Sequence, residues 1–344
     1  MEKNKRIIYY DLLTIFASFF VVAMHCNWIV HRFDGSIAWK QSLIVDVLGY
    51  WAVPVFFMLS GATLLEYPKK YSTKVFLKKR FSKTVLPFIV WSIIAFLYAV
   101  YNGTIDLEHF TVIKFFDMFL TTKFMGIYWF FIPLFMAYLS IPVLSYFAIT
   151  EKKYLWYMCG VGFVSYSIYP FLCNLFHIGK NNLLFFPLTG GYLLFVILGY
   201  LLSVTEFSKK VRAILYTVGI GSALIQYTGT YYLSMRTGSE NMLFREYLNW
   251  PSVLFSISVF IWFKYSFFNK IEKQKVLKAI GEISSTGFGI YLIHMYIINF
   301  MCEQYGVTGY SLRWRIGGPI LVYFISFTLI KCMQKIPIVR KIVP

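Results

Sequence analysis

The chain has 344 residues, of which 58% are hydrophobic, 21% are aromatic and only 14% are charged. A soluble domain has too little interior to bury so much apolar surface, so the composition excludes a soluble globular protein. The net charge of +18 indicates membrane topology and attraction to anionic lipid, because no basic segment alternates with base-stacking aromatic residues as nucleic-acid binding would require.

Apolar runs long enough to cross a hydrocarbon core of roughly 30 Å follow one another along the whole chain. We therefore expect an all-α integral membrane protein in which residues 1–344 form a single domain of about ten transmembrane helices. Polar and Pro/Gly clusters set the limits of these helices. The expected ranges are 9–30, 43–65, 84–101, 127–148, 154–173, 183–204, 211–233, 251–268, 280–302 and 314–334.

Two of these ranges have special features. The first is too long for a signal peptide and lacks a small-x-small cleavage site, so we expect an uncleaved span. The sixth contains Pro187, Gly190 and Gly191, which predict a kinked or broken helix. Most of the 33 Lys and Arg residues fall on one side if both termini are cytoplasmic, which is the orientation that the positive-inside rule predicts.

The five cysteines show neither paired nor CxxC spacing, and their odd number argues against a disulfide framework. The five histidines show no HxxxH or HExxH spacing. The sequence therefore predicts no metal site.

The polar residues of the first span share one helical face. At 100° per residue, Asp11, Thr14, Ser18 and His25 fall within a narrow stripe. A polar group facing lipid would remain unsatisfied, so we expect this stripe to face the interior of the bundle. His25 lies fourteen residues after Asp11, about 21 Å along the helix axis, which places it in the outer third of the membrane.

The ninth span carries a matching stripe. Ser284, Gly287, Tyr291 and His294 share a face, and His294 reaches about the same depth as His25. Two histidines at one depth predict a common cavity. The alternative is that each ring makes only an interhelical hydrogen bond.

Five segments in order resemble the signatures of the membrane acyltransferase-3 family: "RIIYYDLLTIFASFFVVAMH", "VPVFFMLSGATLL", "FLKKRFSKTVLPFIVW", "YWFFIPLFMAYLSIPVL" and "GEISSTGFGIYLIHMYII". The resemblance implies ten spans and transfer of an acyl group, usually acetyl from cytoplasmic acetyl-CoA, to an extracytoplasmic sugar or lipid-linked sugar. It implies location in the bacterial cytoplasmic membrane among membrane lipids. It places His25 at the essential histidine of the first helix and His294 at the histidine of the ninth. We expect the stand-alone form without an extracytoplasmic domain.

One position departs from the family pattern. The family usually has an Arg eleven residues before the first histidine, and this chain has Thr14. An Arg would supply a fixed positive charge suited to a phosphate, and Thr cannot replace that charge.

The resemblance also implies a donor site near the cytoplasmic surface. We expect Lys79, Arg80 and Lys83, in a basic loop between the second and third spans, to contact the phosphates of acyl-CoA. The alternative is that positive-inside topology alone explains these charges. Thr14 and Ser60 complete the predicted donor site, although Ser60, next to a glycine, is also typical of close helix packing.

We interpret His25 as the general base that takes the proton of the acceptor hydroxyl. His294 then orients the acceptor or donates to the oxyanion. Asp46, at the outer start of the second helix, is either the residue that holds a His25 tautomer or a plain helix-end aspartate. A covalent acyl-histidine is an alternative to direct transfer.

A second function class is a multipass transporter or flippase for a small polar solute or a lipid-linked sugar, which the broken sixth span and the intramembrane polar residues favour. A third is a degenerate family member that serves as a partner subunit, which rests on Thr14 alone.

Overall fold

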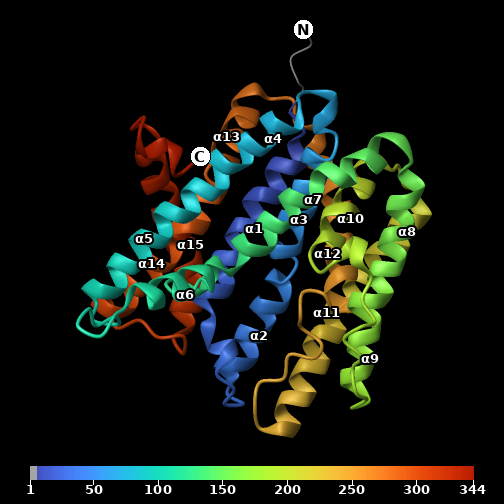
Figure 1. Cartoon of the computed structure of the whole chain (residues 1–344). Helices are drawn as coiled ribbons and strands as arrows, with labels where there is room; N and C mark the ends of the chain where they lie inside the picture. The colour runs from blue at the N-terminus through green and yellow to red at the C-terminus, as the bar shows by residue number, and fades with distance from the viewer. Residues whose placement is uncertain (1–5) are drawn as a thin grey trace.

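The computed structural model describes residues 6–344, in which all regular secondary structure is helical and no strand occurs. Figure 1 shows the helices gathered into one bundle. The α-helices are α1 (Ile8–Cys26), α2 (Ile37–Gly49), α3 (Ala52–Leu64), α4 (Thr73–Arg80), α5 (Leu86–Tyr101), α6 (Val112–Leu120), α7 (Phe131–Thr150), α8 (Lys152–Phe163), α9 (Tyr169–Leu175), α10 (Leu193–Val204), α11 (Lys209–Thr237), α12 (Trp250–Tyr265), α13 (Gln274–Ser284), α14 (Gly287–Tyr305) and α15 (Leu312–Gln334).

Among the described residues, seven helical segments are long and apolar enough to cross a membrane. An eighth is obtained when α13 and α14, which are bent by 53° at a short break, are taken as one span. The all-α membrane fold is thus confirmed. The ten predicted ranges each overlap a helix, but α10 is only 12 residues long and α11 is not among the seven segments, so the number ten and the cytoplasmic location of the termini remain predictions.

The sixth predicted span is broken, as its glycines and proline indicate. Residues 190 and 191 precede α10, and Gly191 has a φ of +55°, a left-handed conformation that glycine adopts without steric cost. The helix begins only at Leu193. The apolar residues before the break lie outside any α-helix.

The basic loop predicted between the second and third spans is largely helical, so that expectation was wrong. Residues 73–80 form α4, a π-helical turn covers Phe81–Val85, and α5 follows without interruption. Lys, Leu and Arg are good helix formers, and the segment contains no glycine. Pro87 lies in the first turn of α5, where the π-helical turn accommodates its missing N–H.

The centre of the bundle is a close contact between α3 and α10. A Cβ on Gly61 would lie 1.8 Å from the carbonyl oxygen of Val196, and a Cβ on Gly199 would lie 2.0 Å from that of Met58. Both obstacles are backbone atoms that cannot move aside alone. The glycines therefore set the distance between the two helices, which confirms the packing interpretation of the segment around Ser60.

Helix α1 runs through the bundle between α3 on one side and α14 and α15 on the other (Figure 1). The first described residues, α4 and α13 lie at one end of the bundle, which we call the upper end as it stands in Figure 1, and the C-terminal segment also lies toward it. The turn between α1 and α2 and the lower part of α11 lie at the opposite, lower end. In this arrangement the polar face of α1 packs against other helices along its whole length.

Candidate active site

The polar residues of α1 face the interior, as their helical spacing predicts. Ser18 is 2% exposed, and its hydroxyl oxygen lies 3.2 Å from that of Tyr323 on α15. The hydroxyl of Thr14 donates to the carbonyl oxygen of Tyr10 at 2.9 Å. His25 lies in the last turn of the same helix. The stripe thus places one histidine at the lower end of a polar interior face.

His25 and His294 are hydrogen-bonded to each other. Nε2 of His294 lies 2.9 Å from Nδ1 of His25. His294 is fully buried, and its Nδ1 lies 3.1 Å from the carbonyl oxygen of Ile290, one turn earlier in α14. The structure therefore brings together the two histidines for which matching depths predicted a common cavity.

The carbonyl of Ile290 fixes the tautomers of both rings when they are neutral. A carbonyl oxygen can only accept, so Nδ1 of His294 must carry a proton and its Nε2 must be an acceptor. Nδ1 of His25 then donates to that acceptor. Nε2 of His25 is left unprotonated and is the nitrogen available to a bound molecule.

The same geometry revises the role predicted for His294. Both of its ring nitrogens are occupied, one by the carbonyl of Ile290 and the other by His25. It has no free N–H for an acceptor or an oxyanion. Its position instead suits the task of holding the orientation and tautomer of His25, as an aspartate does in hydrolytic triads.

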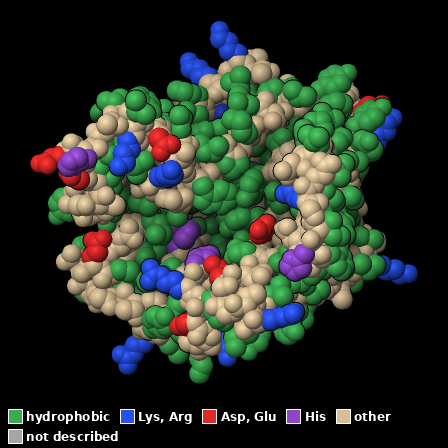
Figure 2. Space-filling view, turned by 60° about the horizontal axis from the view of Figure 1, so that its bottom comes forward, with side chains coloured by type: hydrophobic (Ala, Val, Ile, Leu, Met, Phe, Trp, Pro, Cys, Tyr) green, Lys and Arg blue, Asp and Glu red, His purple; other side chains and the backbone are tan. Residues whose placement is uncertain are grey.

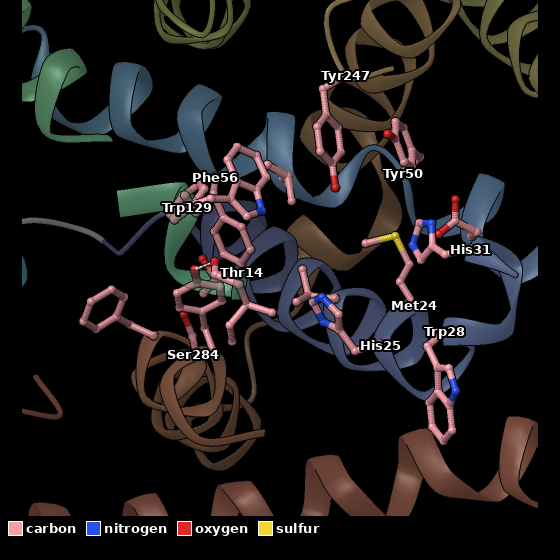
Figure 3. Close-up of a pocket in the computed structure, with 18 of the residues that line it drawn as sticks. Thr14, Met24, His25, Trp28, His31, Tyr50, Phe56, Trp129, Tyr247 and Ser284 are labelled. Carbon is pink, nitrogen blue, oxygen red and sulfur yellow. Dashed lines mark hydrogen bonds between the residues drawn. The ribbon is translucent and has the colours of Figure 1, made fainter. Parts of the chain in front are cut away.

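A cavity of about 580 Å³, which we call the lower cavity, contains the ring of His25. Figure 2 looks at the lower end and shows a hollow with histidine side chains inside it, and Figure 3 shows the lining residues at close range. Thr14 and three residues of the predicted stripe, Ser284, Gly287 and Tyr291, line it as well, whereas His294 is buried behind His25 and does not. The lining residues with polar side chains or aromatic rings include Trp28, His31, Asp46, Tyr50, Phe56, Trp129, Tyr247, Ser284 and Tyr291.

A second cavity of about 400 Å³, which we call the upper cavity, lies on the other side of Thr14. Thr14 and Phe56 line both cavities, so the two spaces meet at these side chains. The upper cavity is lined mainly by α1, α3 and the α4 and α7 residues Arg80 and Tyr138. A long flexible molecule entering at the upper end would pass Thr14 before it reached His25.

Arg80 is the one of the three predicted basic residues that lines the upper cavity. Its guanidinium lies 5.6 Å from the ring centroid of Tyr138, and within residues 6–344 its buried Nε has no hydrogen-bond partner. Lys79 is exposed and stacks on Tyr71, with Nζ 3.8 Å from the ring centroid. Lys83 is also exposed and lines neither cavity.

Ser60 and Thr14 both line the upper cavity, as the predicted donor site requires. The hydroxyl of Ser60 donates to the carbonyl oxygen of Phe56 at 3.0 Å, one turn earlier. Arg6 lines the same cavity and pairs with Asp11, with Nη2 2.9 Å from Oδ1. The charge of Arg6 is thus already neutralised, which leaves Arg80 as the cation with unused hydrogen-bonding capacity.

Asp46 does not contact His25. It lies in the last turn of α2, and its carboxylate forms a salt bridge with Arg245. Both side chains are almost completely buried. The prediction that Asp46 holds a His25 tautomer was wrong because its partner is 199 residues away in sequence, and no local pattern indicates such a contact.

Arg245 also pairs with Glu240, and Nδ1 of His31 lies 3.0 Å from Oε1 of Glu240. Burial alone would raise the pKa of Glu240, but the hydrogen bond with His31 and the charge of Arg245 outweigh it and hold the pKa below its ordinary value. These ion pairs connect residues 238–249, the segment between α11 and α12, to α2 and to the turn that follows α1. Arg245 and Glu240 are not among the predicted site residues, and their only signal in the sequence is their presence in a short loop.

Among the described residues, one group of side chains has metal-ligand spacing. Asp106, Glu108 and His109 place one ligand atom each within 4.8 Å of one another. All three are exposed, and the hydrogen bond of 3.0 Å between His109 and Asp106 accounts for their proximity. The group lines neither cavity.

A comparison with protein-family models finds one described as an acyltransferase domain, which matches residues 7–331, nearly the whole chain. Comparisons with curated proteins and with solved structures find no match.

Proposed function

This chain belongs to the membrane acyltransferase family whose domain model it matches, and on that premise we propose that it transfers an acetyl or other acyl group from cytoplasmic acyl-CoA to a hydroxyl of an extracytoplasmic, cell-surface carbohydrate. The observation that carries the proposal is the hydrogen-bonded pair of His25 and His294 in a cavity that meets a second cavity at Thr14. The two cavities offer separate places for a donor and an acceptor, and the base lines the lower cavity.

Charge favours the upper cavity for the donor. Acyl-CoA is polyanionic, and Arg binds phosphate through charge-assisted hydrogen bonds. Arg80 lines the upper cavity with an unused Nε, whereas exposed Lys79 and Lys83 lie on the same helical segment outside it. In this arrangement the two lysines attract the donor, and Arg80 contacts it.

Arg80 also supplies a positive charge that the family Arg would provide at the position of Thr14. Thr14 lies where the cavities meet, and its hydroxyl is occupied by the carbonyl of Tyr10. It supplies space and no charge. The positive charge of the upper cavity comes instead from Arg80, so we propose that the donor passes Thr14 with its uncharged pantetheine arm.

The chemical step follows from the tautomers. The acceptor hydroxyl gives its proton to Nε2 of His25 as its oxygen bonds to the thioester carbonyl carbon. The carbon–sulfur bond then breaks, and CoA leaves as a thiol that takes the proton from His25. His294 holds the ring of His25 throughout. Transfer through an acyl-histidine at the same Nε2 is the alternative.

Rapid-quench labelling separates these two routes. Purified protein is mixed with radioactive acetyl-CoA without any acceptor. Direct transfer leaves no label on the protein. Stable label on the wild type that is absent from His25→Ala would establish the covalent route instead.

The environment of the helices supports a membrane location. Large apolar side chains such as Leu139, Val143 and Ile220 are exposed on the outer surface of the bundle, where lipid would cover them. We propose the bacterial cytoplasmic membrane, with the upper end cytoplasmic, because the donor is made inside the cell.

Acetyl-CoA binding tests the proposal without knowledge of the acceptor. Purified protein in lipid nanodiscs is titrated with acetyl-CoA by calorimetry, and slow thiol release is followed by absorbance. We expect both binding and release. If the wild type and Thr14→Arg show neither, the acyltransferase activity is abandoned, and a transporter that uses the two adjacent cavities becomes the better explanation.

A further inference from the structure

Three aromatic rings form a continuous stack in the wall of the lower cavity. The ring centroids of Trp129 and Tyr247 are 5.8 Å apart at 25°, and those of Tyr247 and Tyr50 are 4.3 Å apart at 15°. The three residues come from the turn before α7, from the segment 238–249 and from the junction of α2 and α3. All three line the lower cavity, and Figure 3 shows the hydroxyl of Tyr247 directed into it.

The polar atoms of this stack are unused by the protein. Within residues 6–344, no hydrogen bond is found for the phenol oxygens of Tyr50 and Tyr247 or for the indole N–H of Trp129. None of these atoms is enclosed without a partner, so each is open to the cavity. Burial, together with the negative charge of Asp46, raises the pKa of the Tyr247 phenol, so it remains a neutral donor. Ligand pockets place a few convergent polar groups in their lining, so three such groups that open into one cavity suit a bound molecule that supplies their partners.

The position of the stack depends on the ion pairs already described. Arg245 lies with its guanidinium carbon 5.9 Å from the ring centroid of Tyr50 and is bonded to Asp46 and Glu240. Tyr247 follows Arg245 by two residues. The buried salt bridge therefore holds Tyr247 against Tyr50 and fixes the spacing of the polar atoms.

We propose that this stack is the acceptor subsite, and that it takes a sugar ring with several free hydroxyl groups. This inference rests on the proposed acyl transfer. Two phenol O–H groups and one indole N–H, carried on aromatic rings, match a sugar ring that carries hydroxyls between C–H groups. The same cavity contains the available Nε2 of His25, so a sugar held by the stack presents a neighbouring hydroxyl to the base.

Removal of the hydroxyls alone tests the assignment, since Phe keeps the stacked rings. Tyr50→Phe, Tyr247→Phe and the double variant are assayed in nanodiscs with acetyl-CoA and, as acceptor probes, the methyl glycosides of glucose, galactose and N-acetylglucosamine. Acetyl transfer is followed by mass spectrometry, and acceptor-free thiol release is measured in parallel. A site built to bind hydroxyls discriminates strongly once a partner is lost, so we expect the KM for the glycosides to rise at least about tenfold in the double variant.

Tyr227→Phe is the matched control, because Tyr227 stacks on Tyr231 of the same helix and lines neither cavity. It should leave the ratio of transfer to hydrolysis unchanged. Thermal unfolding of each variant checks that the fold is retained.

The outcomes separate the two proposals. If the wild type neither binds nor hydrolyses acetyl-CoA, the acyltransferase activity fails, and this inference fails with it. If the wild type hydrolyses the donor but acetylates no glycoside, or if the folded double variant keeps the wild-type KM for the glycosides, the acyltransferase activity stands and the acceptor subsite is refuted.

Discussion

The lower and upper cavities differ in how their polar groups are satisfied. Asp46, which lines the lower cavity, is paired with Arg245, which also pairs with Glu240 behind the lining. The neutral polar groups open to this cavity include Nε2 of His25 and the hydroxyls of the aromatic stack. The upper cavity is lined by the cation Arg80, for which no salt bridge is found within residues 6–344.

This difference suggests separate tasks for the two spaces. A neutral lining with one available imidazole nitrogen suits proton transfer from an uncharged hydroxyl. A lining with an unpaired guanidinium suits an anion. Thr14 and Phe56, which line both cavities, mark the point at which a donor from one side meets a base on the other.

The sharpest test of the lower cavity is His25→Ala. Loss of a general base typically costs about 10²- to 10⁴-fold in rate, so thiol release from acetyl-CoA should fall by that factor while donor binding in the upper cavity persists. His109→Ala, which changes an exposed histidine outside both cavities, is the control. Undiminished thiol release from His25→Ala would show that the histidine pair is only structural.

Arg245→Ala tests whether the lower cavity depends on its buried ion pairs. Removal of one partner leaves Asp46 buried and unpaired, which costs about 3–5 kcal/mol. We expect a large fall in the thermal unfolding midpoint, and partial recovery when Asp46→Asn is added. Arg6→Ala is the comparison at the upper end, because Arg6 is 57% exposed in its pair with Asp11, and such pairs contribute about 0–1 kcal/mol. Equal losses in the two variants would contradict the contrast between the cavities.

Arg80→Gln tests the charge of the upper cavity. Loss of a charge-assisted hydrogen bond of about 1.5–3 kcal/mol should raise the Kd for acetyl-CoA roughly 10- to 100-fold, as measured by calorimetry. Lys83→Gln removes the same charge from an exposed position and should change Kd only slightly. If Lys83→Gln weakens binding as much as Arg80→Gln does, the donor lies along the surface of α4 and not in the upper cavity.

The smallest expected effect is the contribution of Glu240 to the stability of the protein at low pH. Its pKa is lowered in the folded protein, so its contribution to stability is fully present above the ordinary value of 4.5 and is lost as the pH falls through the lower folded value. Unfolding midpoints of the wild type and Glu240→Gln should differ at pH 7, by at most about 1 kcal/mol for this partly exposed group, and converge in acid. A difference that is independent of pH would mean that the carboxylate charge is not what His31 and Arg245 stabilise.

Much of this protein was predictable from local sequence. Apolar runs are set by composition, so the membrane fold and the approximate helix ranges follow from it. The stripe of Thr14, Ser18 and His25 and the matched depth of His294 follow from the period and rise of a single helix. These properties need no knowledge of which helices touch.

What the tertiary structure alone decided depends on contacts between distant segments. Asp46 pairs with Arg245, which is distant in sequence. The helix that carries Arg80 places Arg80 in the lining of the upper cavity. The carbonyl of Ile290 selects the tautomer of His294. The way two helices pack depends on the shapes of the residues that face each other. At Gly61 and Gly199 the absence of a side chain lets the two backbones come into contact. The sequence could therefore nominate the two histidines, but only packing could show that one of them orients the other.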